Sequence, residues 1–378
     1  MSGNVFCYYL ASAADRVEAS GGIWERPLPD SPGRTDAAVS DRVAPTYGDY
    51  FMAVRRFLEA DNYRVVIRVL SRDTGLSYSS DAICGIHIFL IKHGAFYHPC
   101  RIEIQGRTFR KDFAVNVAVS EVGKGCIHRE FCLLQRLNAS VSASFLPMVF
   151  DYADIALENH VQFKMFLAEW CEGFHEFHMA FDPESQCFRT HVWDSERRIG
   201  FLSPEQTHEL YRRIAVILTT YYNPESFEQI FPWHHAAGDF VVSCSGARVD
   251  VRLITVRQYA AMYASESTND DARLEALLLF LVNMSIRTRI DRVDGIGDFI
   301  WAEVYVLDAT VQGFLECMAE RRPEYYQMIR RAVQTLDTGE FCEAVVSSYN
   351  PNAPELPMIL SHMADHVMQL QEVLAVRL

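Results

Sequence analysis

The stretch FPWHHAAGDFVVSCSGARVDVRLITVRQY, residues 231–259, decides how this sequence is interpreted. It contains two apolar runs, Phe240–Ser243 and Val249–Val256. Between them stands Ser245-Gly246, a dipeptide that is typical of a tight turn. Runs rich in β-branched residues on both sides of such a turn predict a buried β-hairpin.

A crowded polar cluster directly precedes this hairpin and contains Trp233, His234, His235 and Asp239. Imidazole and carboxylate groups suit both general-base catalysis and metal binding. We therefore predict His234, His235 and Asp239 as candidate catalytic residues, with Asp239 also a candidate metal ligand. The alternative is a hydrogen-bonded structural corner covered by Trp233, and the sequence leaves both interpretations open.

Composition indicates a globular protein of ordinary character. The chain has 378 residues, of which 49% are hydrophobic and 22% charged, and its net charge is −14. This length predicts two domains or lobes. Because binding to nucleic acid depends on clustered Lys and Arg, the acidic balance argues against a nucleic-acid partner, although a local basic pocket is compatible with it.

The cysteines and the N-terminus favour a cytoplasmic protein. The ten cysteines form no CxxC pair, and the first residues lack the basic start and apolar run of a signal peptide. The longest apolar run, Leu274–Ile286, is interrupted by Glu275 and Asn283 and is too short to span a bilayer. We expect free thiols and no membrane partner.

The first half of the chain predicts a strand-rich domain. Residues 1–80 form an N-terminal extension that includes a Pro- and Asp-rich loop at 25–47, and residues 81–172 form the β-rich part. Periodicity and turn residues predict helices at Tyr50–Leu58 and Ile127–Leu137, and strands at Ile83–Lys92, Phe96–Gln105, Asp112–Ser120, Met148–Tyr152 and Phe163–Trp170.

The second part, residues 173–378, is predicted to be mostly helical. Its helix at Pro204–Tyr222 has the strongest start signal, with Ser203 as N-cap, Pro204 at the first helical position and Gln206 completing a capping box. The other predicted elements are strands at Glu176–Phe181 and Phe188–Trp193, the hairpin within 231–259, and helices at 270–288, 301–320, 323–336 and 354–376.

This order of elements resembles the protein-kinase-like fold, the group that includes protein kinases and aminoglycoside phosphotransferases. The resemblance implies an α+β, two-lobed protein with a small antiparallel β lobe carrying one helix, a larger helical lobe, and a cleft between them. It also implies ATP and Mg²⁺ as cofactors.

Several site residues are implied by this resemblance alone. Glu130 matches the helix glutamate, and Asn116 stands near the place of the strand lysine. Phe163–Glu172, with Glu169, is similar to the hinge that meets an adenine. Asp239 takes the place either of the metal-binding asparagine, with His234 as catalytic base, or of the catalytic aspartate itself.

The chain departs from the family pattern at three places. The strand lysine is missing, no convincing glycine-rich phosphate loop is present, and Thr255 stands where a second metal-binding aspartate belongs. Phosphoryl transfer depends on positioning and neutralising the phosphates. The leading hypothesis is a degenerate phosphotransferase relative that binds a nucleotide or small ligand. The alternatives are a regulatory module for a protein partner, and a metal-dependent hydrolase built on His234, His235 and Asp239.

Three further motifs favour structural interpretations. His175-Glu176-Phe177-His178 lacks the spacing of HExxH and predicts strand surface. His87, His93, His98 and Cys100 fit no zinc spacing. Gly123-Lys124-Gly125 precedes a helix, where backbone N–H groups attract anions, but it lacks the full phosphate-loop pattern and more often forms a flexible turn.

Overall fold

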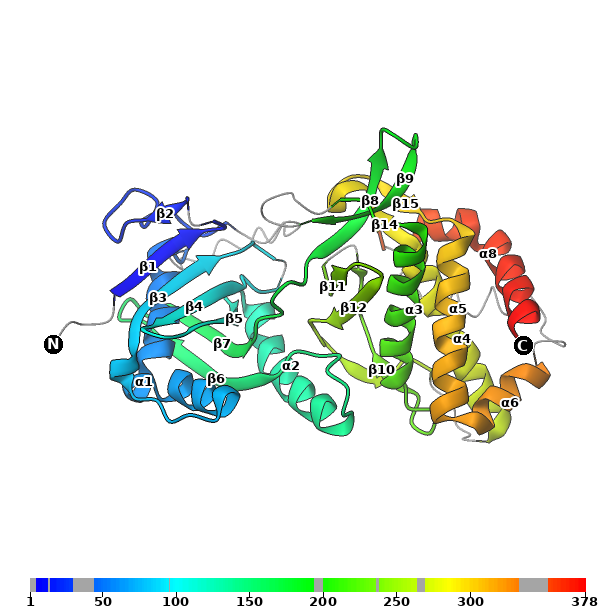
Figure 1. Ribbon diagram of the computed structural model, residues 1–378, viewed down its shortest axis with the longest axis horizontal. Coiled ribbons are helices and arrows are strands. Elements are labelled where there is room, and N and C mark those ends of the chain that lie inside the picture. The colour runs from blue at the N-terminus through cyan, green and yellow to red at the C-terminus, as the bar shows by residue number, and fades with distance from the viewer. Residues whose placement is uncertain are drawn as a thin grey trace. The chain divides into compact units, whose positions relative to one another are not determined.

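The computed structural model describes two compact units. Unit 1 comprises residues 1–142 and 147–172, and unit 2 comprises residues 143–146 and 173–378 (Figure 1). Within these limits the described residues are 5–12, 14–29, 44–94, 96–193, 200–235, 238–263, 269–332 and 353–378. Of the predicted loop at 25–47, only residues 25–29 and 44–47 are among the described residues.

Unit 1 is built on a seven-stranded mixed sheet with the order β2-β1-β3-β4-β5-β7-β6. Its strands are β1 (Val5–Leu10), β2 (Arg16–Val17), β3 (Ile83–Leu90), β4 (Cys100–Gly106), β5 (Arg110–Ala118), β6 (Val149–Ala156) and β7 (Gln162–Glu169). The predicted run of three strands, a helix and two more strands is confirmed, and β7 pairs with both β5 and β6.

Two features of this sheet differ from the prediction. The lobe is not purely antiparallel, because β1 lies parallel to β3 over Val5–Leu10 and Gly85–Leu90. The parallel strand belongs to the segment predicted as an N-terminal extension, which also supplies α1 (Tyr47–Thr74) to unit 1. Pairings across about 80 residues of sequence leave no local periodicity signal, so sequence reading missed them.

Helices cover opposite faces of the sheet. Thr46 and Asp49 form a capping box at the start of α1, and the apolar side of α1 joins the core made with Ile86, Ile102 and Val115. The helix α2 (Glu121–Ser140) packs on the other face, because its Phe131 ring lies 6.0 Å from the ring of Phe166, a residue whose neighbours in β7 point into the α1 core.

The predicted strand Phe96–Gln105 is wrong at its beginning. The strand starts at Cys100, and the described residues before it form the connection from β3. The carbonyl oxygen of Phe96 lies against Gly123 of α2, where a β-carbon would come within 2.2 Å of it. Gly123 is therefore needed for the close approach of this connection to the helix, and the predicted flexible turn at 123–125 is the first part of α2.

Unit 2 contains short two-stranded sheets and most of the helices. Its strands are β8 (Glu176–Asp182), β9 (Cys187–Trp193), β10 (Glu228–Ile230), β11 (Phe240–Ser245), β12 (Arg248–Leu253), β13 (Tyr259–Ala261), β14 (Ile290–Arg292) and β15 (Phe299–Trp301). Its helices are α3 (Pro204–Thr220), α4 (Asp270–Arg289), α5 (Val304–Arg321), α6 (Pro323–Ala332) and α8 (Leu356–Arg377). Residues 333–336 of one predicted helix lie outside the described residues.

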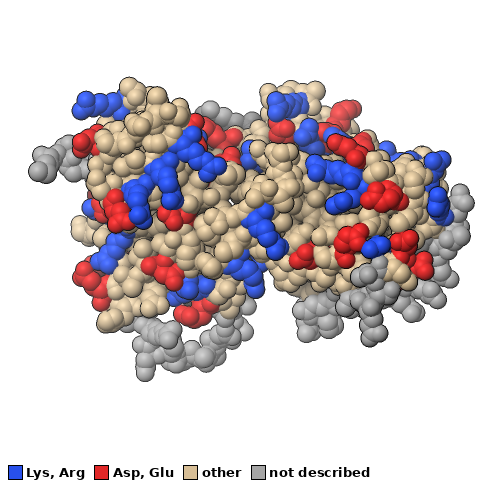
Figure 2. Space-filling model, turned by 90° about the horizontal axis from the view of Figure 1, so that it is seen from below, with Lys and Arg blue, Asp and Glu red and all other residues tan. Residues whose placement is uncertain are grey.

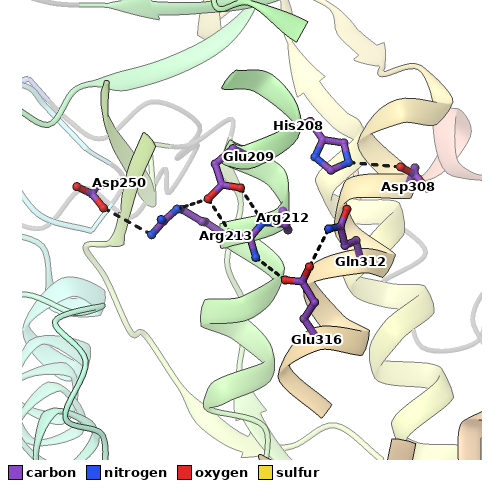
Figure 3. A network of polar contacts seen from close by, with 8 residues as sticks. All are labelled: His208, Glu209, Arg212, Arg213, Asp250, Asp308, Gln312 and Glu316. Carbon is purple, nitrogen blue, oxygen red and sulfur yellow. Dashed lines mark hydrogen bonds and ion pairs between the residues drawn. The ribbon is translucent and has the colours of Figure 1, made fainter. Parts of the chain in front are cut away.

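The helices α3 and α5 pack closely against each other. Ser203 and Gln206 form the predicted capping box of α3. At Gly313 of α5 a β-carbon would come within 2.1 Å of the Arg212 carbonyl oxygen, so glycine permits this approach. Figure 3 shows a polar network over the pair, in which Arg212 and Arg213 share Glu209, and Arg213 also reaches Asp250 of β12.

These elements define an α+β fold, in agreement with the predicted class. No helix in the described part of the chain combines the length and apolar character needed to cross a membrane. On the face drawn in Figure 2, basic and acidic side chains lie interspersed. Surface ion pairs of unit 1 include Arg56 with Glu158 and Arg68 with Asp151.

A pair of glycine substitutions tests the packing of α2. Gly123→Ala should destabilise unit 1 by about 1–3 kcal/mol, because the new methyl group meets a backbone oxygen that cannot move away alone. Gly125→Ala is the matched control, because nothing lies within 4 Å of its β-carbon position. It should stabilise the helix by up to about 1 kcal/mol. Urea unfolding would contradict this account if both changes had the same sign.

Candidate functional site

The candidate site of unit 2 is the Trp233–Asp239 segment, which connects β10 to β11. The strand β10 pairs with β13, and β11 pairs with β12, so short ladders hold both ends of the segment. Trp233 is buried, and its ring meets Phe240 edge-on at 5.7 Å. The pairing of β11 with β12 confirms the predicted hairpin.

Asp239 is engaged by an arginine that sequence reasoning missed. Its carboxylate accepts two hydrogen bonds from the Arg257 guanidinium, at 2.6 and 2.7 Å, and a third from the His234 backbone N–H at 2.8 Å. Asp239 is 2% exposed. The bidentate pair thus places a fixed positive charge against a carboxylate removed from water.

The two histidines of the segment are held in their neutral form. Burial, followed by the effects of His235 and Arg287, lowers the pKa of His234 to about 3. Burial also lowers the pKa of His235, whose ring stacks on Phe177 at 5.8 Å. Neutral imidazoles can accept a proton, but at such a low pKa His234 is a weak base at pH 7.

A buried acid beside these histidines was also missed. Asp291 accepts the backbone N–H groups of Met179 and Arg292 at 2.7 Å each and contacts His178 Nδ1 at 3.3 Å. His235 Nδ1 lies 3.9 Å from the same carboxylate. Burial raises the pKa of Asp291, but His235, His178 and these hydrogen bonds lower it overall.

The prediction that residues 175–178 form strand surface is wrong at Phe177, which is buried, and at His178. Its side chain is buried against Asp291, a residue 113 positions away in the chain. Asp291 itself belongs to β14, a strand of three residues. No local sequence pattern indicates the contact between His178 and Asp291, so it could be found only in the structure.

The residues of the segment do not fit a metal site. Both carboxylate oxygens of Asp239 are occupied by Arg257, and no three His, Cys, Asp or Glu side chains of the described residues come together in a way that could hold a metal ion. The same holds for the histidine group of unit 1, where Cys100 contacts the Val115 carbonyl oxygen and His87 contacts Tyr9.

The predicted cofactor residues fall in both units. Asn116 pairs in register with Phe166, so it lies on the sheet face that α2 covers, and Glu130 is buried within α2. Glu169 has a structural role, because its Oε2 accepts the Met148 backbone N–H at 3.2 Å. In unit 2, Thr255 follows Ile254, whose N–H donates to the Asp239 carbonyl oxygen at 2.8 Å.

Comparison with known proteins gives limited guidance. No family model matches the sequence. No curated protein matches it either. Among solved structures, WaaP in complex with acyl carrier protein has a TM-score of 0.30 at 11% identity, covering 66% of this chain and 86% of that one. The maize sucrose-induced receptor kinase 1 kinase domain bound to AMP-PNP has a TM-score of 0.26 at 12% identity, covering 73% and 89%. At these scores neither likeness establishes the fold.

Removing the partner of Asp239 should be costly. Arg257→Met leaves a buried carboxylate without its cation and should lower the free energy of unfolding by about 3–5 kcal/mol. The double variant Asp239→Asn with Arg257→Met should lose less than the sum of the single changes. Arg248→Met on the same hairpin is the control, because its side chain is 75% exposed; its cost should stay below about 1 kcal/mol. Additive losses in urea unfolding would contradict the coupling.

Acid should destabilise the protein through three histidines that are buried or half-buried. The pKa is lowered to about 4 at His98 and to about 3 at His234 and His366, while an unfolded histidine titrates near 6.5. The unfolded state therefore binds more protons below pH 6.5, and stability falls as pH decreases from there towards the folded pKa values. Each group contributes up to about 1.4 kcal/mol per pH unit.

Urea unfolding at pH 7.5 and pH 5 measures this dependence. His366→Gln should reduce the slope, whereas His128→Gln should not, because His128 is exposed. Equal unfolding midpoints at the two pH values would contradict the neutral assignment of the buried histidines.

Proposed function

We propose that this chain is a catalytically degenerate protein of the kinase-like type that acts by binding a ligand. The observation that carries the proposal is the bidentate ion pair between Asp239 and Arg257. In kinase-like enzymes, acidic and amide side chains at this point hold the metal ions that bridge the phosphates. Here a guanidinium takes the place of the metal beside the carboxylate.

The chemistry of the surrounding residues supports the same conclusion. Phosphoryl transfer needs cations on the phosphates and a base near the attacking hydroxyl. This chain has Asn116 near the place of the lysine and Thr255 at the place of the second metal-binding acid. His234, the residue at the place of the base, has a pKa of about 3. Each required charge is therefore missing or neutralised.

The ligand that we propose is a nucleotide or a nucleotide-like small molecule bound without a divalent metal. Binding makes smaller demands than catalysis, because it needs no stabilisation of charge that develops in a transition state. A regulatory role towards a protein partner is compatible with this proposal. A non-catalytic module acts by changing conformation, and its ligand stabilises the conformation that the partner recognises.

Thermal unfolding with ATP and ADP, each with and without Mg²⁺, tests the proposal. A ligand that binds only the native state raises the melting temperature by mass action. We expect a shift with nucleotide that Mg²⁺ does not increase, and no ATP turnover. Asp239→Asn should keep the nucleotide shift, because the carboxylate serves Arg257.

Two results would overturn the proposal. One is a nucleotide shift that requires Mg²⁺ and disappears in Asp239→Asn. The other is measurable phosphate transfer by the wild-type chain. The absence of any shift with either nucleotide would contradict the proposed ligand. The turnover assay alone would then test whether the chain is non-catalytic.

A further inference from the structure

Arg289, the last residue of α4, is a buried cation without an acidic partner. The residue is 4% exposed, and no carboxylate oxygen of the described residues lies within 4.0 Å of its guanidinium. Several other arginines with poorly exposed side chains do have such a partner. These pairs are Arg101 with Asp112, Arg189 with Asp182, Arg212 with Glu209, Arg257 with Asp239, and Arg377 with Asp308.

The hydrogen bonds of Arg289 leave one side of the guanidinium unused. Nε donates to the Ala302 carbonyl oxygen at 2.8 Å. Nη1 donates to Gln369 Oε1 at 2.8 Å and to His366 Nδ1 at 3.3 Å. Nη2 donates to none of the described residues and is not fully enclosed. Its two N–H groups are therefore available to a ligand from solvent.

None of these neighbours supplies negative charge. Ala302 and Gln369 contribute neutral oxygens. His366 is buried between Arg289 and Ser285, whose Oγ lies 2.9 Å from His366 Nε2, and burial and Arg289 together lower the pKa of His366 to about 3. The ring is thus neutral at pH 7. The exposed acid Glu303 is the carboxylate that acts on Arg289, through space and without contact.

The charge itself persists at neutral pH. Burial lowers the pKa of Arg289 only to about 10, so the guanidinium stays protonated. A charge removed from water without an opposite charge is expensive. The Trp301 ring, 4.9 Å from the guanidinium carbon, offsets part of this cost through a cation–π contact. A bound anion would offset more of it.

Aromatic rings border this place on unit 2. Trp301 of β15 stacks on His362 of α8, with ring centroids 4.8 Å apart and planes 16° from parallel. The two rings join β15 to α8 beside Arg289, and His366 meets the edge of Trp301 at 5.6 Å. A small planar or tetrahedral group suits a site where one guanidinium nitrogen makes no hydrogen bond to the described residues and aromatic rings lie beside it.

We propose that Arg289 anchors a binding site for a small oxyanion, a carboxylate or phosphate group, between β15 and α8. The two N–H groups of Nη2 donate to the anion, while Nε and Nη1 keep their bonds to Ala302 and Gln369. The anion supplies the charge that the described chain lacks at this point. Its occupancy fastens α8 to the rest of unit 2. This site is separate from Asp239 and does not depend on the proposed function.

Thermal unfolding at constant ionic strength tests the site with inorganic phosphate and with acetate as probes, each against chloride. Wild-type protein should show a saturable rise in melting temperature of a few degrees, roughly, with at least one probe in the millimolar range. Arg289→Lys, which keeps the positive charge but loses the planar guanidinium with its paired N–H donors, should lose most of this rise. Arg330→Gln, which removes an exposed charge from the same unit, should keep it.

The two probes distinguish the source of the group: a response to phosphate alone indicates a phosphorylated ligand, and a response to acetate alone indicates a carboxylate. No rise with either probe up to about 50 mM, or an equal rise in Arg289→Lys, would overturn the site, because occupancy at that concentration should be nearly complete. If Arg289→Lys does not fold, ³¹P line broadening by wild-type protein decides, and an unbroadened phosphate signal would overturn a phosphate site. The rise in melting temperature with nucleotide should persist in Arg289→Lys. Loss of the anion response alone therefore distinguishes this site from the site of the proposed function.

Discussion

The ion pair between Asp239 and Arg257 is the contact on which the central part of unit 2 depends. It connects the segment before β11 to the segment after β12, and so joins the two ends of one hairpin. The His234 backbone N–H adds a third bond to the same carboxylate. A buried carboxylate without this partner would carry a desolvation cost of several kcal/mol, so the local chain path and the charge balance are maintained together.

This pair also determines what the segment can do chemically. Both oxygens of the Asp239 carboxylate accept hydrogen bonds from Arg257, so a metal ion would compete there with a fixed cation. Its neighbours are the half-buried His234 and the buried His235, and both are neutral at pH 7. Stability and catalysis therefore make opposite demands on Asp239. The chain satisfies the first demand with three hydrogen bonds to the Asp239 carboxylate, and metal binding there would compete with them.

Much of the fold was predictable because its signals are local. The capping box at Ser203, the strand-turn-strand pattern of 240–253 and the apolar strand predicted at Asp112–Ser120 each arise from neighbouring residues. The first two were found at the expected place, and the third was found as β5, shifted by two residues. The parallel pairing of β1 with β3 was not predictable in this way, because parallel strands share no turn and the partners lie far apart in sequence.

The candidate site was predictable only as a set of residues. Sequence reasoning selected Asp239, His234 and His235 from their side-chain chemistry, but their roles depend on Arg257 and Asp291, which are remote or inconspicuous in the sequence. An arginine in the loop that follows β12 gives no sign in the sequence of the acid that it contacts. The chemistry of a buried carboxylate is set by its partners in space, and these come only from the fold.

The most direct measurement is an experimental structure of crystals soaked in Mn²⁺ together with a non-hydrolysable ATP analogue. Mn²⁺ takes the oxygen ligands that Mg²⁺ prefers, and its anomalous scattering identifies it without ambiguity. Our account predicts that the Arg257 guanidinium remains bidentate on Asp239, with no anomalous peak beside that carboxylate. A Mn²⁺ peak within bonding distance of Asp239, with Arg257 displaced, would contradict it.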